Sequence, residues 1–375
     1  MNGAVNGAWS AFDRWVARGP FTATDLGRYR VLFALLLLLT PSRYAWAGQF
    51  PDSFVNGPPG PFMLLRAVPP REVLLGLDVL VLLAAGFLLL GLFTRTASVV
   101  AGLTMLTGNG ISYSFGKIDH SIFLVLVPLV LVFARWGDAV SVDSLRRRYR
   151  QGGPAAGPAA APPQWPLRLL ALLVGLGFLT AAAPKLLSGW LSPATQAVQG
   201  VMHTQYHVNG RTEFLAGTLL DVRSALFWES VDVATVLLEG LLVLAVLNWR
   251  AWRIGIAVAS LFHFGVLLMM NIGFAANVFT YAAFVAWGSL RLPAVRVLPR
   301  RWLARYGWTV AVAVGLFAAF RPEEWVVPRQ GQLIVVLGAL VSTWYLLRQV
   351  RVLLRRGRPG ARSPQPAHDE AAAAR

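Results

Sequence analysis

The chain has 375 residues, of which 56% are hydrophobic and 14% are charged, and its mean hydropathy is +0.57. This composition is typical of an integral membrane protein and excludes an ordinary water-soluble domain. There is no cysteine, which excludes disulfides, thiolate metal sites and cysteine nucleophiles. The formal net charge of +17 raises the question of a nucleic-acid partner, which the placement of the charges answers below.

The first twenty residues (1–20) are predicted to form an amphipathic helix that lies in the membrane interface. In "GAWSAFDRWVARG", Trp9, Phe12 and Trp15 fall on one helical stripe, whereas Arg14 and Arg18 lie elsewhere. Aromatic residues on one face and arginines on another are typical of interfacial helices. A plain linker is the alternative. No cleavable signal peptide is visible, because charged and aromatic residues precede the first apolar run.

Ten apolar runs follow, and together they predict an all-α fold, a polytopic bundle of transmembrane helices. A helix crosses a hydrocarbon layer of about 30 Å with roughly 17–25 residues, and each run is near or within that length. The runs are Val31–Trp46, Val73–Leu92, Thr96–Tyr113, Ile118–Phe133, Leu167–Leu187, Leu226–Leu247, Ile254–Met270, Ile272–Leu290, Trp308–Phe320 and Leu333–Leu347.

The arginines indicate the orientation of this bundle. Most of the 34 basic residues fall on the same side as the N-terminus when the ten runs alternate in direction. The positive-inside rule then predicts that both termini are cytoplasmic. The basic excess is thus an orientation signal and an attraction to anionic headgroups. We expect membrane lipids as partners and no nucleic acid.

Three segments between or after the runs have compositions of their own. Residues 146–164, rich in arginine and then in Gly, Pro and Ala, predict a flexible cytoplasmic linker. The segment 188–225 predicts short amphipathic helices over the outer mouth of the bundle. The tail 357–375 has few large apolar residues, and we expect it to be disordered.

Ionisable and polar side chains within the runs gather in the outer half of the predicted bundle. Such groups cost about 3 kcal/mol or more at a helix centre, so each needs a partner or a role. Asp232 and Glu239 are seven residues apart and therefore share one face of their helix. The other members of the set are Asp78, Asp119, His120, Lys185, His263 and Asn271.

Lys185, in "AAAPKLLSGW", is the residue of this set most suggestive of chemistry. Only two of the 34 basic residues are lysines, and the other one, Lys117, lies in a predicted loop. Arginine stays protonated, whereas a desolvated lysine amine can lose its proton and act as a base. The alternative is structural: Lys185 extends to the headgroups or pairs with Asp232.

The histidines also leave two interpretations open. His120 and His263 lie in the same half of the bundle as Lys185, which favours a shared site, but either can be an ordinary interhelical hydrogen-bond partner. His203 and His207, in "HTQYH", have the i, i+4 spacing of a metal-binding pair without an acidic third ligand. We expect a surface helix there and no metal site.

Three stretches together give the chain a family resemblance: "KIDHSIFLVLVPLVLVFARWGDAVSVDSL", "FLTAAAPKLLSGWL" and "FHFGVLLMMNIGFAANVFTYAAF". They resemble the HTTM superfamily of membrane proteins, which includes the vitamin K-dependent γ-glutamyl carboxylases. The resemblance covers residues 21–291, an HTTM-like transmembrane domain, and leaves 292–350 for two additional spans. The family's "SVD" resembles Ser141–Asp143.

The resemblance implies an activity and a set of roles. Lys185 matches the proposed base of the carboxylases, and His120 and His263 match the family's histidines. The implied reaction takes place on the outer face: a neutral lysine deprotonates a reduced quinone, oxygen adds, and the strong base that results removes a γ-proton from a substrate glutamate before CO2 is captured. The implied enzyme is a carboxylase-like lyase or carbon–carbon ligase that uses reduced vitamin K or menaquinol and a peptide or protein substrate.

A second interpretation is non-catalytic. The stretch "LLLGLFTRTASVVAGLTML" resembles DoxX-like membrane proteins, which are quinone-associated, so the chain is alternatively a quinone- or lipid-binding protein or an assembly factor. In the first interpretation Lys185, His120 and His263 are catalytic, and Asp119, Asp232, Glu239 and Asn271 help to bind the quinol. Both interpretations predict an integral protein of a bacterial plasma membrane.

Overall fold

The computed structural model describes residues 2–41, 43–151, 161–291, 300–322 and 329–356. These residues form fourteen α-helices together with short 3₁₀ and π segments. No strand occurs in the described ranges. The all-α class predicted from the sequence is confirmed.

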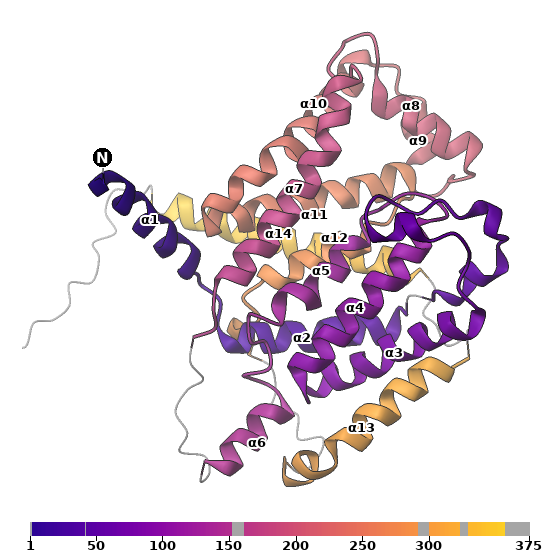
Figure 1. The fold of residues 1–375 in the computed structure, drawn as a ribbon. Coiled ribbons are helices and arrows are strands. Elements are labelled where there is room, and N and C mark those ends of the chain that lie inside the picture. Colours follow the sequence, from indigo (N-terminus) through magenta and orange to yellow (C-terminus); the bar gives the residue numbers. More distant parts are fainter. Residues whose placement is uncertain (1, 42, 152–160, 292–299, 323–328, 357–375) are drawn as a thin grey trace, which may run out of the picture.

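The long helices pack into one bundle, and several short helices lie at its ends (Figure 1). The α-helices are α1 (Asn2–Ala17), α2 (Ala23–Leu39), α3 (Arg71–Leu90), α4 (Thr94–Tyr113), α5 (Ile122–Leu131), α6 (Val142–Arg150), α7 (Trp165–Leu187), α8 (Ala197–His203), α9 (Ala216–Leu220), α10 (Ala225–Leu241), α11 (Trp249–Met270), α12 (Ala275–Tyr281), α13 (Arg300–Phe320) and α14 (Gln330–Arg356). The short segments are η1 (Ala45–Gln49), η2 (Asp52–Phe54), η3 (Pro61–Leu64), η4 (Thr204–Val208), η5 (Leu242–Leu247), η6 (Ala282–Phe284) and η7 (Trp287–Ser289).

Among the residues that the structure describes, six helices are long and apolar enough to cross a membrane by length and composition. They are α3, α7, α10 continued by η5, α11, α13 and α14, and each coincides with one of the ten predicted runs. Many of their large apolar side chains are exposed, including Leu237, Leu241 and Leu337. Exposed apolar surface on this scale suits a hydrocarbon environment, so the protein is an integral membrane protein.

Two predicted spans are wrong as continuous helices. The run Ile118–Phe133 contains only the ten residues of α5, and the run Ile272–Leu290 contains the seven residues of α12 followed by 3₁₀ turns. At 1.5 Å per residue these helices are about 15 and 10 Å long, well short of the roughly 30 Å of a hydrocarbon core. The number of spans therefore stays a prediction.

The remaining two runs differ from the structure in other ways. The run Val31–Trp46 corresponds to α2, which begins earlier, at Ala23, behind a capping box formed by Thr22 and Asp25. It ends at Leu39, before η1. The run Thr96–Tyr113 agrees with α4, but threonine, serine, asparagine and glycine make this helix too polar to count among the six.

The short helices α5 and α12 occupy the middle of the bundle and contact each other (Figure 1). Helix α5 also packs on α7, and α12 packs on α11 and α14. Irregular backbone at membrane depth is tolerated only where protein or a cavity surrounds it. Their central position therefore accounts for how two interrupted helices can exist there, and it places their ends beside the histidines described below.

Three segments outside the spans also bear on the sequence predictions. Residues 2–17 are helical, as expected for the segment 1–20. The first residues of the expected linker 146–164 continue α6, whereas 152–160 and the tail 357–375 lie outside the described residues. The expected short helices between residues 188 and 225 are α8, η4 and α9.

Candidate functional site

Lys185 forms an ion pair with Glu239, and this pair joins α7 to α10. The lysine side chain is 21% exposed and the glutamate side chain 9%. The ring of Trp190 lies 5.2 Å from the Lys185 ammonium, within the range of a cation–π contact. A carboxylate, an amine and an indole therefore meet in a largely shielded place at the end of α7.

Glu239 and Asp232 share one buried face of α10, as their spacing predicted. The Asp232 carboxylate is fully buried and accepts hydrogen bonds from the backbone amides of Ala197 and Val198, at 2.7 and 2.8 Å. These amides begin α8 and have no partner within that helix. Asp232 therefore caps α8, and the lysine pairs with Glu239 instead.

His263 of α11 is the centre of a second group of buried polar side chains. Its Nε2 atom is hydrogen-bonded to the hydroxyl of Tyr281 at 2.9 Å, and the Asn277 amide donates to the same hydroxyl at 3.4 Å. The side chain of His263 is 3% exposed. A Tyr281 hydroxyl that donates to Nε2 leaves the ring proton of His263 on Nδ1, whereas one that accepts from Nε2 leaves Nδ1 as an acceptor.

Phe274 links the two histidines of the predicted site. Its ring stacks on His263 with centroids 4.4 Å apart, and it lies 4.8 Å from the His120 ring. Burial lowers the pKa of His120, which sits in the loop before α5, against an opposing effect of Asp119 and a reinforcing one of Lys117. The neutral imidazole of His120 is therefore favoured.

Several buried polar atoms around His263 have no hydrogen-bond partner among the described residues. They include Nδ1 of His263, Oδ1 of Asn277 and Oγ of Ser260. Buried polar groups are nearly always satisfied in proteins, so unsatisfied ones require an explanation such as a ligand. Two of the three atoms, on His263 and Asn277, belong to the residues that meet at the Tyr281 hydroxyl.

The two groups are connected through α7. Phe178 lies 5.7 Å from His263 and 6.4 Å from Tyr281, measured between ring centroids. Lys185 follows Phe178 by seven residues and so lies on the same face of the helix. The predicted residues Lys185, His120 and His263 thus border one region of the bundle, although no direct contact joins the lysine to either histidine.

The other predicted binding residues make contacts of a different kind. Asp119 accepts a hydrogen bond from the backbone amide of Ser121, within its own turn. Asn271 ends α11 in a left-handed conformation, donates to Glu213 and accepts from Gln332. Asp78 accepts from the amides of Tyr44 and Ala45, beside η1. These side chains hold loops and helix ends in place.

Sequence reasoning missed four residues of this region: Phe178, Phe274, Asn277 and Tyr281. Phe178 and Tyr281 lie in apolar runs, and apolar character alone does not distinguish a site residue from a packing residue. Asn277 carried a signal, because an amide inside an apolar run needs a partner just as an ionisable group does. The contact of Phe274 with both histidines depends on the tertiary fold.

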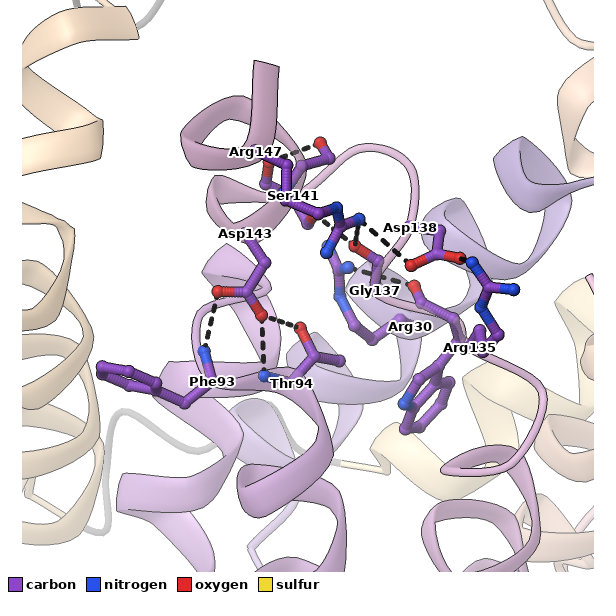
Figure 2. Close-up of polar contacts among 11 residues, drawn as sticks. Arg30, Phe93, Thr94, Arg135, Gly137, Asp138, Ser141, Asp143 and Arg147 are labelled. Atoms are coloured by element: carbon purple, nitrogen blue, oxygen red, sulfur yellow. Dashed lines mark hydrogen bonds and ion pairs between the residues drawn. The ribbon is translucent and has the colours of Figure 1, made fainter. Parts of the chain in front are cut away.

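The motif Ser141–Asp143 lies far from Lys185. Ser141 accepts from the Ser144 amide at the start of α6. Asp143 accepts from the amides of Phe93 and Thr94 at the start of α4 (Figure 2). The loop between α5 and α6, which leads into the motif, lies near the start of α7, because Phe133 of this loop contacts Trp165. Lys185 is at the other end of that helix, about 30 Å away at 1.5 Å per residue.

A buried arginine completes this capping network. The guanidinium of Arg30 donates to the carbonyls of Leu88, Trp136 and Val140, at 2.8, 3.1 and 2.5 Å. Nearby, Asp138 forms ion pairs with both Arg135 and Arg147 (Figure 2). These contacts tie α2, α3, α4 and α6 together at one end of the bundle, so we assign this motif a structural role.

His203 ends α8, His207 lies in η4, and both side chains are exposed. The rings of His203 and His207 stack with centroids 5.6 Å apart. No group of three or more His, Cys, Asp or Glu side chains within the described ranges is arranged to hold a metal ion.

Fold and site together define a polytopic α-helical membrane protein with buried polar side chains between its helices. The family model of the HTTM domain matches residues 19–288, well over half of the 375 residues, and the chain belongs to this family. No curated protein and no solved structure matches the chain. Helices α13 and α14 lie beyond the matched region and pack on α3 and α11, which lie within it.

Proposed function

We propose that this protein is a membrane-embedded enzyme in which the Lys185–Glu239 pair removes a proton from a lipid-borne quinol. The observation that carries the proposal is the pair itself: an amine with a carboxylate as its direct acceptor, largely shielded from water. Isolated charges at membrane depth are costly, and such residues often mark proton-transfer sites. The resemblance of "PKLLSGW" to the carboxylases gives the pair a matching role.

The residues of the chain divide this task. Glu239 accepts a proton from the Lys185 ammonium, which leaves a neutral amine and a carboxylic acid. The neutral Nζ atom then takes a proton from a hydroxyl group placed beside it and becomes an ammonium again. A positioned base of this kind contributes typically 10²–10⁴-fold to a rate.

The region around His263 fits a quinol by its chemistry. Nδ1 of His263 and Oδ1 of Asn277 are buried without partners among the described residues. A quinol hydroxyl can accept a hydrogen bond from a protonated Nδ1 and donate one to an amide oxygen. The rings of Phe178, His263, Phe274 and Tyr281 offer flat apolar contacts for an aromatic head group. A bound quinol supplies an acidic hydroxyl and two reducing electrons. Asp119, Asp232 and Asn271 are engaged elsewhere, and the proposal does not use them as ligands.

The test is quinol oxidation by the purified full-length chain in lipid nanodiscs. Reduced menaquinone, oxygen, labelled bicarbonate and a glutamate-containing peptide are supplied, and quinol loss and label incorporation are measured. Lys185→Arg keeps the charge and is expected to abolish turnover. Lys117→Arg changes the only other lysine of the sequence, which is exposed, and is expected to retain turnover. Full turnover by Lys185→Arg contradicts the proposal. Quinol loss without label supports the proton transfer but excludes peptide carboxylation.

One observation favours a second candidate function. In the structure the Lys185 ammonium is already paired, and a carboxylate within contact distance stabilises the charged amine. A non-catalytic protein that binds a quinone or lipid requires only this static pair. Purification in native lipids followed by mass spectrometry separates the two: a bound quinone without turnover, unchanged in Lys185→Arg, supports the binding protein.

A further inference from the structure

A basic cavity lies at the end of the bundle opposite Lys185. It has a volume of about 350 Å³ and is lined by Ala11, Arg14, Trp15, Arg18, Gly19, Arg168 and Trp249. Arg168 is near the start of α7, so at 1.5 Å per residue it lies about 25 Å along the helix from Lys185. The cavity is therefore independent of the site proposed above. Its volume is within the range of about 300–1,000 Å³ that small-molecule sites occupy.

Arg168 is the buried member of this cavity. Its side chain is 6% exposed, and its guanidinium lies between two indole rings, 4.5 Å from the centroid of Trp15 and 3.9 Å from that of Trp249. One nitrogen donates to the carbonyl of Val246 at 2.5 Å, but the buried Nε has no partner. Arg168 lines the cavity, and a buried donor without an acceptor among the described residues is explained by an acceptor from outside the chain.

The charge around the cavity is of one sign. Arg14 and Arg18 are exposed and join Arg168 in the lining, and no carboxylate among the described residues pairs with any of the three. Asp13, the one acidic residue of α1, does not line the cavity. Three guanidinium groups around one hollow select an anion, and guanidinium geometry matches phosphate oxygens.

The position of α1 indicates which phosphate. Trp15 donates to the carbonyl of Leu247 at 2.8 Å, and Trp249 donates to that of Arg18 at 3.0 Å, so α1 is held against the end of η5 and the start of α11. On the same helix Trp9 is 63% exposed and Phe12 is 51% exposed. Aromatic side chains beside arginines are the pattern of a helix that lies among lipid headgroups and upper acyl chains.

We propose that this cavity binds the phosphate headgroup of an anionic phospholipid, with its acyl chains along Trp9 and Phe12. Basic pockets between transmembrane helices are known lipid-headgroup sites. The bound lipid stabilises α1 on the bundle, because Arg14, Arg18 and Arg168 then share one counter-ion.

The test is lipid binding by the delipidated full-length protein in detergent, measured by native mass spectrometry. Phosphatidylglycerol and phosphatidylcholine with identical acyl chains are titrated separately, and inorganic phosphate is added as a competitor. The variant is Arg14→Gln with Arg18→Gln, because both side chains are exposed and their loss leaves the fold intact. The control is Arg148→Gln with Arg150→Gln, which removes the same charge from exposed positions on α6 that do not line the cavity.

Phosphatidylglycerol is expected to bind the wild type and the control more tightly than phosphatidylcholine does. About 1 kcal/mol per arginine near a membrane surface corresponds to about fivefold in affinity, so the cavity variant loses about 25-fold. Equal binding of the two lipids, or equal losses in both variants, overturns the proposal. Displacement of phosphatidylglycerol by millimolar inorganic phosphate also overturns it, because the cavity is then a site for free anions.

Discussion

Lys185 near the end of α7 and Glu239 on α10 are 54 positions apart in the chain and form an ion pair. Helices α7 and α10 pack directly on each other, and the ion pair is part of this contact. It also keeps each charge from being buried alone. Lys185 and Glu239 are therefore the key residues both of the proposed proton transfer and of its alternative, a purely structural ion pair. Stability and turnover must be measured separately to tell the two apart.

The first prediction concerns the stability of this pair. Lys185→Met leaves the Glu239 carboxylate without its partner, and breaking a buried pair typically costs 3–5 kcal/mol. We expect a loss near the lower end, about 3 kcal/mol, because Lys185 is partly exposed. The double variant Lys185→Met with Glu239→Leu recovers most of the loss, since it removes both charges. The free energies come from denaturant unfolding in mixed micelles, and a double variant no more stable than Lys185→Met contradicts the interpretation.

The pairing shows both what the sequence predicts and what it leaves open. The seven-residue spacing of Asp232 and Glu239 correctly placed them on one face, because helix geometry alone determines this. Which carboxylate pairs with Lys185 depends on the packing of α8 against α10, because the first amides of α8 bind Asp232. No local sequence pattern around Ala197 and Val198 predicts their contact with Asp232.

Span prediction shows the same division between local and tertiary information. Hydropathy located the six helices that are long and apolar enough to cross a membrane, because length and composition are properties of each segment alone. It failed for α5 and α12, whose runs are apolar throughout but are interrupted in the structure. An apolar run in the middle of a bundle is buried whether or not it is helical. Its hydropathy therefore does not report where the helix ends.

The second prediction tests Asp232 as the cap of α8. Asp232→Asn preserves the shape but presents an amide group where a charged oxygen accepts from Ala197 or Val198. The expected destabilisation is about 1–3 kcal/mol, the usual cost of a buried donor left without its acceptor. Hydrogen exchange at the α8 amides should accelerate in this variant and stay unchanged in Asp221→Asn, whose side chain is exposed. Protection equal to wild type in Asp232→Asn excludes the capping role.

The third prediction concerns the contact of α3 with α13, the helix beyond the matched family domain. A Cβ atom on Gly86 would lie 2.2 Å from the backbone oxygen of Ala311, whereas one on Gly76 of the same helix meets nothing within 4 Å. Glycine at such a crossing allows two membrane helices to approach closely. Gly86→Ala is expected to destabilise by about 1–3 kcal/mol through overpacking. Gly76→Ala is expected to be neutral or to stabilise by about 0.5–1 kcal/mol, and thermal unfolding of the two variants tests the contrast.

The fourth prediction separates quinol positioning from proton transfer. Under the proposed function, the Tyr281 hydroxyl holds Nε2 of His263 and so directs Nδ1 toward the bound hydroxyl. Tyr281→Phe removes the two hydrogen bonds of this buried hydroxyl, which costs about 1–3 kcal/mol of stability. It should raise the KM for quinol and leave kcat nearly unchanged, because Lys185 and Glu239 are intact. Lys185→Arg should do the reverse, with kcat lost and quinol binding retained.

Tyr29→Phe is the matched control for this separation. Its hydroxyl is also buried and donates to the carbonyl of Phe279 in α12, at 3.2 Å, without touching a histidine. Both tyrosine variants therefore lose a buried hydroxyl, and general weakening of the bundle affects both. A rise in KM confined to Tyr281→Phe identifies Tyr281 as a positioning residue. Equal rises in both variants instead assign the effect to bundle stability, and His263 then loses its role as the quinol ligand.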